Sequence, residues 1–194
     1  KEIKKKLKNI SAILIPGGFG KRGTEGKIEA IKFARKNKIP FLGICYGMQM
    51  AIIEFARNQL NIKKATSSEF DKKGLAIIGL MNEWSKDGKK IKGTDKNLGG
   101  TMRLGSYDAK LMKNSMIRKI YRKNLIKERH RHRYEVNIAF KEKFEKNGMN
   151  FSGLSPDGKL PEIIELKNHP WFIGVQFHPE FKSRPLAPHP LFSS

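Results

Sequence analysis

The chain has 194 residues, of which 38% are hydrophobic, and its formal net charge is +22, with lysine providing 30 of the 40 basic residues. This length is typical of a single domain, here residues 1–194, and no run approaches the roughly 18 apolar residues of a membrane span. The only cysteine, Cys45, excludes an internal disulfide and two-cysteine zinc spacings, so we expect a reducing, cytoplasmic location and no membrane contact.

The first predicted unit is a strand followed by a helix. Residues 11–16, SAILIP, form a short apolar run that ends at a proline and the loop GGFG, which predicts a buried strand. In residues 26–38, apolar side chains recur with helical spacing, and Thr24 is the expected N-cap.

The second predicted unit surrounds Cys45. Residues 39–44, IPFLGI, form another buried-strand candidate. Directly after Cys45, Met48, Ala51, Ile52 and Phe55 follow the i, i+3, i+4, i+7 spacing of a helix with one apolar face. Two strands alternating with two helices indicate an α/β domain with a parallel sheet.

The rest of the chain reads mainly as extended segments. Residues 74–84 and 172–177 are predicted to be strands, and residues 115–124 a short helix. Asp87-Gly88 predicts the turn of a hairpin, and Pro156-Asp157-Gly158 predicts another turn. The segments 99–111, 131–137 and 153–166 are also expected to be extended, the first with a glycine-rich bend.

Cys45 lies where the second strand becomes a helix, between Gly43 and Gly47. A nucleophile on a sharp strand-to-helix turn needs small neighbours on both sides, as in the Gly-x-Ser-x-Gly elbow of hydrolases. The start of the helix favours thiolate. The alternative interpretation is a buried core cysteine, since free cysteines are often buried.

His178 is the best candidate for the base that a thiol nucleophile needs. Pro179 favours extended geometry at His178, which places the side chains of His178 and Glu180 on the same side, so that Glu180 can orient the imidazole. In the segment 129–133, alternation puts three arginines on one side and His130 and His132 on the other, which makes these two histidines weaker candidates. A structural histidine beside a turn is the alternative for His178.

The loop PGGFG, residues 16–20, can bring backbone N–H groups close to a developing negative charge. Gly18 and Tyr46, the residue after the nucleophile, could together form an oxyanion hole. The alternative is an ordinary glycine turn. Neither a dinucleotide-binding fingerprint nor a P-loop motif occurs, so no ATP site is expected in this chain.

Together, the cysteine elbow and the later His-Pro-Glu resemble the class I glutamine amidotransferases. The strings PGGFGKRGTEGKIEAIKFAR, FLGICYGMQMAIIEFAR, NLGGTMRLG, ERHRHRYEVN and VQFHPEFKSRPLAPHPLF are similar to the glutaminase domains of the CTP synthase family, essentially end to end. The resemblance implies Cys45 as nucleophile, His178 as general base and then acid, and Glu180 as its orienter. It also implies a glutamine site formed by Gly18, Tyr46, Gly47, Met48, Gln49, Glu69 and Arg133.

The implied fold is a three-layer, flavodoxin-like, open and mostly parallel sheet with helices on both faces and an antiparallel extension. The implied reaction is glutamine hydrolysis that supplies ammonia to an amidoligase domain, which aminates UTP to CTP. No metal or cofactor is implied for this domain. ATP and Mg²⁺ are expected only in the amidoligase part, GTP as an allosteric activator of the full enzyme, and homo-oligomers through that part.

Two departures from the family pattern stand out. The family usually has leucine after the nucleophile, where this chain has Tyr46. The family's domain also has earlier strand–helix units and a closing helix, so we expect a fragment of a larger chain whose sheet lacks terminal elements.

Two other function classes remain as alternatives. One is a cysteine peptidase or γ-glutamyl hydrolase, although the papain-type signature is absent. The other is a basic nucleic-acid or scaffold module, since a charge of +22 suits phosphate backbones. Scattered lysines on solvated surfaces explain the charge better, because aromatic residues do not interleave with the basic runs as stacking platforms would, and we do not expect nucleic acid as a partner.

Overall fold

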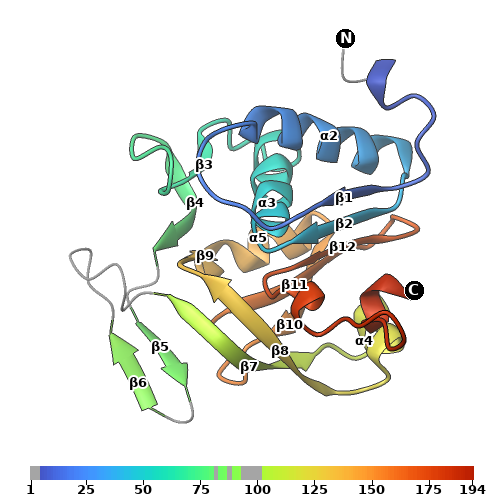
Figure 1. Ribbon diagram of the computed structural model, residues 1–194. Helices are drawn as coiled ribbons and strands as arrows, with labels where there is room; N and C mark the ends of the chain where they lie inside the picture. The colour runs from blue at the N-terminus through green and yellow to red at the C-terminus, as the bar shows by residue number, and fades with distance from the viewer. Residues whose placement is uncertain (1–4, 81–82, 87–88, 93–101) are drawn as a thin grey trace.

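The computed structural model describes residues 5–80, 83–86, 89–92 and 102–194. It confirms the α/β class: a seven-stranded sheet has helices packed on both of its faces (Figure 1). The elements are β1 Ile13–Ile15, α2 Thr24–Asn37, β2 Phe41–Ile44, α3 Tyr46–Asn58, β3 Ala65–Ser67, β4 Leu75–Leu80, β5 Glu83–Lys86, β6 Lys89–Lys92, β7 Arg103–Leu111, α4 Met116–Tyr121, β8 Leu125–His132, β9 Tyr134–Val136, η1 Ile138–Phe140, α5 Lys141–Lys146, β10 Met149–Leu154, β11 Pro161–Leu166, β12 Phe172–Val175, η2 Pro179–Phe181 and η3 Pro190–Phe192.

The large sheet has the strand order β1-β2-β12-β11-β10-β7-β8. Only β1, β2 and β12 pair in parallel, and the remaining neighbours are antiparallel. The sheet is therefore mixed: β1, β2 and β12 form its parallel part, and the expected antiparallel extension is present and is the larger part. Parallel pairing needs a crossover such as α2, which connects β1 to β2, whereas the short turn 155–160 between β10 and β11 can serve only antiparallel strands.

The hydrophobic core is divided between the two faces of this sheet. Phe41 of β2 and Phe172 of β12 face α2 and α3, and their ring centroids are 4.4 Å apart. Their chain neighbours Leu42 and Ile173 point to the opposite face, where Ile117 of α4 packs. This alternation makes both strands fully buried, which explains their continuous apolar sequences.

The two strand–helix units before residue 60 are confirmed, with two differences. Gly23, with φ 72°, occupies the N-cap position of α2, while the Thr24 hydroxyl donates to the Lys21 carbonyl at 2.6 Å; the predicted Thr24 cap is wrong. α3 is buried on all sides from Tyr46 to Ala56 rather than on one face, because it packs against α2, the large sheet and the smaller sheet β3-β4-β9.

The predicted strand over 74–84 is two strands, β4 and β5. The Asp-Gly turn at 87–88 lies outside the described residues, although β5 and β6 on either side of it pair antiparallel. Segment 99–111 contains β7, and its glycine-rich start at 99–101 is not described. Among the described residues, no helix combines the length and the apolar character that crossing a membrane requires.

Candidate functional site

Cys45 occupies a tight elbow between β2 and α3. Its backbone has φ 49° and ψ −99°, a combination that costs a non-glycine residue about 1–3 kcal/mol. Both flanking glycines are required by contact: a Cβ atom at Gly43 would lie 2.7 Å from the carbonyl carbon of Gly47, and one at Gly47 would lie 2.1 Å from the Ile15 oxygen. The Cys45 N–H donates to the Val175 carbonyl at 2.7 Å, which ties the elbow to β12.

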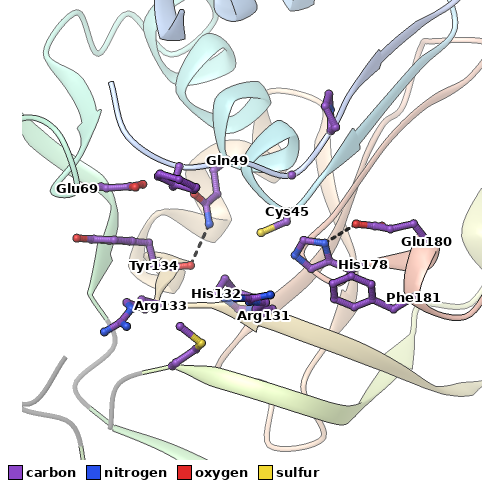
Figure 2. A pocket seen from close by; sticks show the side chains of 15 residues that line it. Cys45, Gln49, Glu69, Arg131, His132, Arg133, Tyr134, His178, Glu180 and Phe181 are labelled. Atoms are coloured by element: carbon purple, nitrogen blue, oxygen red, sulfur yellow. Dashed lines mark hydrogen bonds and ion pairs between the residues drawn. The ribbon is translucent and has the colours of Figure 1, made fainter. Parts of the chain in front are cut away.

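His178 lies just after β12 and beside Cys45 (Figure 2). Its Nδ1 is 2.6 Å from Glu180 Oε1, and its ring stacks on Phe181 with centroids 4.7 Å apart. Because an ionised carboxylate only accepts hydrogen bonds, Nδ1 carries the proton in this pair when the ring is neutral. Nε2 is buried and has no hydrogen-bond partner among the described residues.

Glu180 is held as an anion by this contact. Burial alone would raise the pKa of its carboxyl, but the hydrogen bond from His178, a backbone hydrogen bond and the charges of His178 and His189 together outweigh burial, and the pKa is lowered. Glu180 can therefore orient the imidazole over the pH range in which most proteins work.

The environment of Cys45 stabilises the thiol. Burial, followed by the negative charge of Glu135, raises the pKa of Cys45 to about 12, and the hydrogen bond from the Tyr46 N–H only partly offsets this. The expectation that the helix start would favour thiolate is contradicted, because burial and the charge of Glu135 raise the pKa of Cys45 instead. A reaction at Cys45 needs a base that removes the proton as the new bond forms.

Gly17 of the loop 16–20 lies close to His178. A Cβ atom here would lie 2.8 Å from His178 Cε1 and 3.9 Å from the Cys45 Cβ. Gly18 lies over the Tyr46 ring, whose Cδ1 would be 3.8 Å from a Cβ at Gly18. Sequence reasoning named Gly18 and missed Gly17, although the repeated glycine was a visible signal.

A cavity of about 700 Å³ joins these parts. It is lined by Pro16, Gly17, Gly18, Phe19, Cys45, Gln49, Glu69, Met102, Arg131, His132, Arg133, Tyr134, His178, Glu180 and Phe181. The structure thus brings the predicted catalytic trio together with the predicted substrate residues Gly18, Gln49, Glu69 and Arg133.

Charged groups occupy the end of the cavity away from His178. Figure 2 shows Glu69, Tyr134 and Arg133 on one side and Cys45 with His178 on the other. One Arg133 amino group, Nη1, is buried and has no hydrogen-bond partner among the described residues. Glu69 accepts a hydrogen bond from the Gly20 N–H at 2.7 Å, and burial raises the pKa of its carboxyl. A guanidinium with one nitrogen that no described residue satisfies, together with a carboxylate at the same end, suits a ligand that carries both charges.

Three predicted substrate residues do not line the cavity with their side chains. Tyr46, Gly47 and Met48 are buried at the start of α3, and Met48 belongs to the core beside Gly174. None of these three is among the residues that line the cavity. Gln49 does reach the cavity, where its amide donates to the Tyr134 carbonyl at 3.0 Å and to Gln176 Oε1 at 3.2 Å.

The alternation argument for residues 129–133 is confirmed along β8, where His130 and His132 are buried and Arg129 and Arg131 exposed. It does not separate His132 from the cavity, because β8 ends at His132 and the chain bends before β9 begins. Burial and the charge of Arg103 lower the pKa of both histidines well below the ordinary value, so they are neutral.

A buried ionic network lies beside the part of the cavity that is lined by Arg131, His132 and Arg133. Arg103 donates to Glu135 at 2.9 Å and to Glu162 at 2.7 Å, and His130 Nδ1 is 2.8 Å from His132 Nε2. Burial raises the pKa of Glu135 to about 7 although Arg103 lowers it. Sequence reasoning missed this network because its members lie far apart in the chain. In the parts of the chain described, no three His, Cys, Asp or Glu side chains are grouped so as to hold a metal ion.

Comparison with known proteins agrees with this geometry. The family model "Glutamine amidotransferase class-I" matches residues 1–194. The chain is 89% identical over 193 residues to a CTP synthase of Pelagibacter ubique, covering 36% of that protein, and 61% identical over 188 residues to one of Zymomonas mobilis, covering 35%. The chain therefore spans about a third of the length of these curated relatives.

Solved structures agree as well. The Trypanosoma brucei CTPS glutaminase domain with bound acivicin superposes with a TM-score of 0.86 at 38% identity, over 98% of this chain and 71% of that one. A Thermotoga maritima glutamine amidotransferase shares the fold, with a TM-score of 0.54 at 15% identity over 90% of this chain and 58% of that one. The chain belongs to the class I glutamine amidotransferase family, and within it to the glutaminase domains of CTP synthases.

Proposed function

We propose that this domain hydrolyses L-glutamine to glutamate and ammonia with a triad of Cys45, His178 and Glu180. The observation that carries the proposal is the arrangement of one cavity. A buried thiol lies beside an imidazole, and an arginine with a carboxylate lies at the opposite end; His178 Nε2 and Arg133 Nη1 have no hydrogen-bond partner among the described residues. This polarity matches glutamine, whose amide and zwitterionic end groups are separated by two methylene groups.

In the proposed binding mode, Arg133 pairs with the α-carboxylate of glutamine and Glu69 with its α-ammonium. The free Nη1 of Arg133 supports the first contact, since an unsatisfied buried guanidinium gains from a carboxylate partner. Glu69 keeps its second carboxylate oxygen for the ammonium while the first holds the Gly20 N–H. The backbone of Tyr46, Gly47 and Met48 and the side chain of Gln49 complete the site.

The reaction begins when Cys45 Sγ bonds to the amide carbon of glutamine and the thiol proton passes to His178 Nε2. The raised pKa of Cys45 explains why this transfer accompanies the attack. Backbone N–H groups of Gly18 and Tyr46 stabilise the oxyanion. The C–N bond then breaks as His178 returns the proton to the leaving amino group, which gives ammonia and a thioester. His178 next removes a proton from water, which attacks the thioester to give glutamate and the free thiol.

The ammonia serves an amidoligase domain that converts UTP to CTP, in the cytoplasm, as part of pyrimidine nucleotide synthesis. The support is the name of the relatives, CTP synthase, and their greater length. We propose that ATP and Mg²⁺ act in that domain, that GTP activates the full enzyme, and that homo-oligomers form through it, while residues 1–194 contribute the glutaminase unit without a cofactor.

The proposal is tested by covalent labelling with diazo-oxo-norleucine, an electrophilic glutamine analogue. The chain is combined with the amidoligase domain of the Pelagibacter ubique relative, and the adduct is located by mass spectrometry. We expect one adduct on Cys45, slowed by added glutamine and absent in Cys45→Ser. In His178→Ala, glutamine turnover should fall by at least about 100-fold with the fold retained. A folded parent protein that is neither labelled nor active would contradict the proposal.

A further inference from the structure

The side chain of Tyr46 has a place in the site that its backbone role does not explain. The ring is buried, and its hydroxyl donates to the Gly20 carbonyl at 2.5 Å. The Thr24 hydroxyl lies 2.6 Å from the Lys21 carbonyl and 3.0 Å from the same phenol oxygen, so its proton can be shared between these two acceptors. Because a carbonyl only accepts hydrogen bonds, the Tyr46 hydroxyl must donate its proton to the Gly20 carbonyl.

The glycine loop 16–20 has few other points of attachment. Phe19, its only large side chain, is 88% exposed and contributes no packing. The loop touches His178 at Gly17, lies on the Tyr46 ring at Gly18, and is held at Gly20 from both sides, with Glu69 accepting from the N–H and Tyr46 donating to the carbonyl. Gly20 itself has φ 74°, which only glycine adopts at little cost.

We propose that Tyr46 is a positioning residue: its ring supports Gly18, and its hydroxyl holds the Gly20 carbonyl, so that the loop keeps its backbone N–H in place for the oxyanion. The inference rests on the proposed function and deepens it. Tyr46 then supports the oxyanion in two ways. Its own N–H donates on one side of the oxyanion, and its side chain positions the loop whose N–H donates on the other side. Burial raises the pKa of the phenol, which keeps it protonated and able to donate.

The same contact links substrate binding to the oxyanion loop. Glu69, the proposed partner of the substrate ammonium, also accepts the Gly20 N–H, so the peptide groups on both sides of Gly20 are fixed by residues of the site. Preorganised donors stabilise developing charge more than mobile ones, and losing a donor costs about 100- to 1,000-fold in kcat. A donor that remains but loses one of its anchors should cost less, about 10-fold.

The test is Tyr46→Phe, which keeps the ring and removes the hydroxyl, assayed with the same amidoligase domain. We expect kcat for glutamine hydrolysis to fall about 10-fold, with KM within about twofold of the parent value. Affinity for glutamate γ-semialdehyde, whose adduct with a thiol is tetrahedral, should fall by a similar factor, while affinity for glutamate stays unchanged. A role in packing alone would not separate these two ligands.

Matched variants make the result decisive. Tyr121→Phe removes another phenol hydroxyl that is bonded within the protein, to Glu128 outside the cavity, and should leave kcat unchanged. Thr24→Val removes the hydroxyl group that contacts the Tyr46 phenol oxygen and should lower kcat about threefold. This variant tests the inference if Tyr46→Phe does not fold. Parent values of kcat and semialdehyde affinity in the folded variants would overturn the inference, as would an equal loss of glutamate affinity. An inactive parent would instead refute the glutaminase proposal itself.

Discussion

At the scale of single residues, the site contains a conflict between burial and reactivity. Cys45 is 4% exposed and has a raised pKa, so the proposed nucleophile is a neutral thiol at rest. The neighbouring imidazole has one nitrogen committed to Glu180 and one without a partner among the described residues. The proton must therefore move when substrate is present, and water or small oxidants meet a thiol rather than a thiolate.

This gives a prediction for the pH dependence of alkylation by iodoacetamide. In the folded chain, the rate at Cys45 should keep rising above pH 9, because the thiolate fraction grows only toward a pKa of about 12. The denatured chain is the control, since its one cysteine should titrate near about 8.5. Mass spectrometry of quenched samples measures both. A rate that levels off below about pH 7.5 in the folded chain would mean a preformed thiolate and would contradict the burial argument.

At the scale of elements, the elbow depends on the close approach of α3 to β1. Gly47, in the first turn of α3, leaves no space for a methyl group beside the Ile15 carbonyl, and this neighbour is backbone that cannot rotate away. At Gly26, in the first turn of α2, an added methyl group would meet no atom within 4 Å. Both glycines lie in the first turn of a helix, but a side chain is excluded at Gly47 and would fit at Gly26.

We therefore expect Gly47→Ala to lower the free energy of unfolding by about 3 kcal/mol, because β1 and α3 must separate. Gly26→Ala should raise it by roughly 0.5 kcal/mol, because alanine restricts the unfolded chain and favours the helix. Urea unfolding monitored by circular dichroism measures both. Equal stability of the two variants would show that the elbow relaxes without cost.

The elements also show how far sequence patterns reach. The strand–helix units around Cys45 could be predicted because buried parallel strands are continuously apolar and α3 repeats with helical spacing. α5 could not, since Lys141–Lys146 is short and charged and buries only Phe144. The extent of the antiparallel part could not be predicted, because antiparallel order depends on which strands meet, and no local pattern encodes that.

The candidate site divides in the same way. The grouping of Cys45, His178 and Glu180 could be predicted because a nucleophile elbow and an oriented base need particular neighbours in the chain, the glycines and Pro179. Gln176, whose amide lies 3.6 Å from Cys45 Sγ, and Tyr134 have no such local signature. Their place follows from the ends of β12 and β8, which meet at the cavity only in the folded chain.

At the scale of the whole molecule, one side chain joins the two larger sheets. Arg103 comes from β7, Glu162 from β11 of the same sheet, and Glu135 from β9 of the small sheet β3-β4-β9. All three are at most 5% exposed, and His130 and His132 complete the network. In this network of one arginine, two carboxylates and two neutral histidines, Arg103 provides the positive charge. The network lies beside the part of the cavity that is lined by Arg131, His132 and Arg133.

Arg103→Met should therefore lower the free energy of unfolding by about 3–5 kcal/mol at pH 8, because two buried carboxylates lose their cation. The loss should be smaller at pH 5. Without Arg103, the pKa of both carboxyls rises further above the value of about 4.3 in the unfolded chain, so stability is retained at low pH and falls as the pH increases. Removing Arg103 also lifts the repulsion that lowers the pKa of both histidines, so their protonation compensates only in acid.

Urea unfolding at the two pH values measures this difference, with Arg22→Met as the control for lost charge, because Arg22 is exposed. Arg103→Lys should fall between the parent and Arg103→Met, since an ammonium keeps the charge but cannot reproduce the fork that reaches both carboxylates. Equal effects of Arg103→Met and Arg22→Met at pH 8 would mean that the two sheets are held together by packing alone. A larger effect in acid would reverse the sign derived from the carboxylates and would place the dominant charge on the histidines.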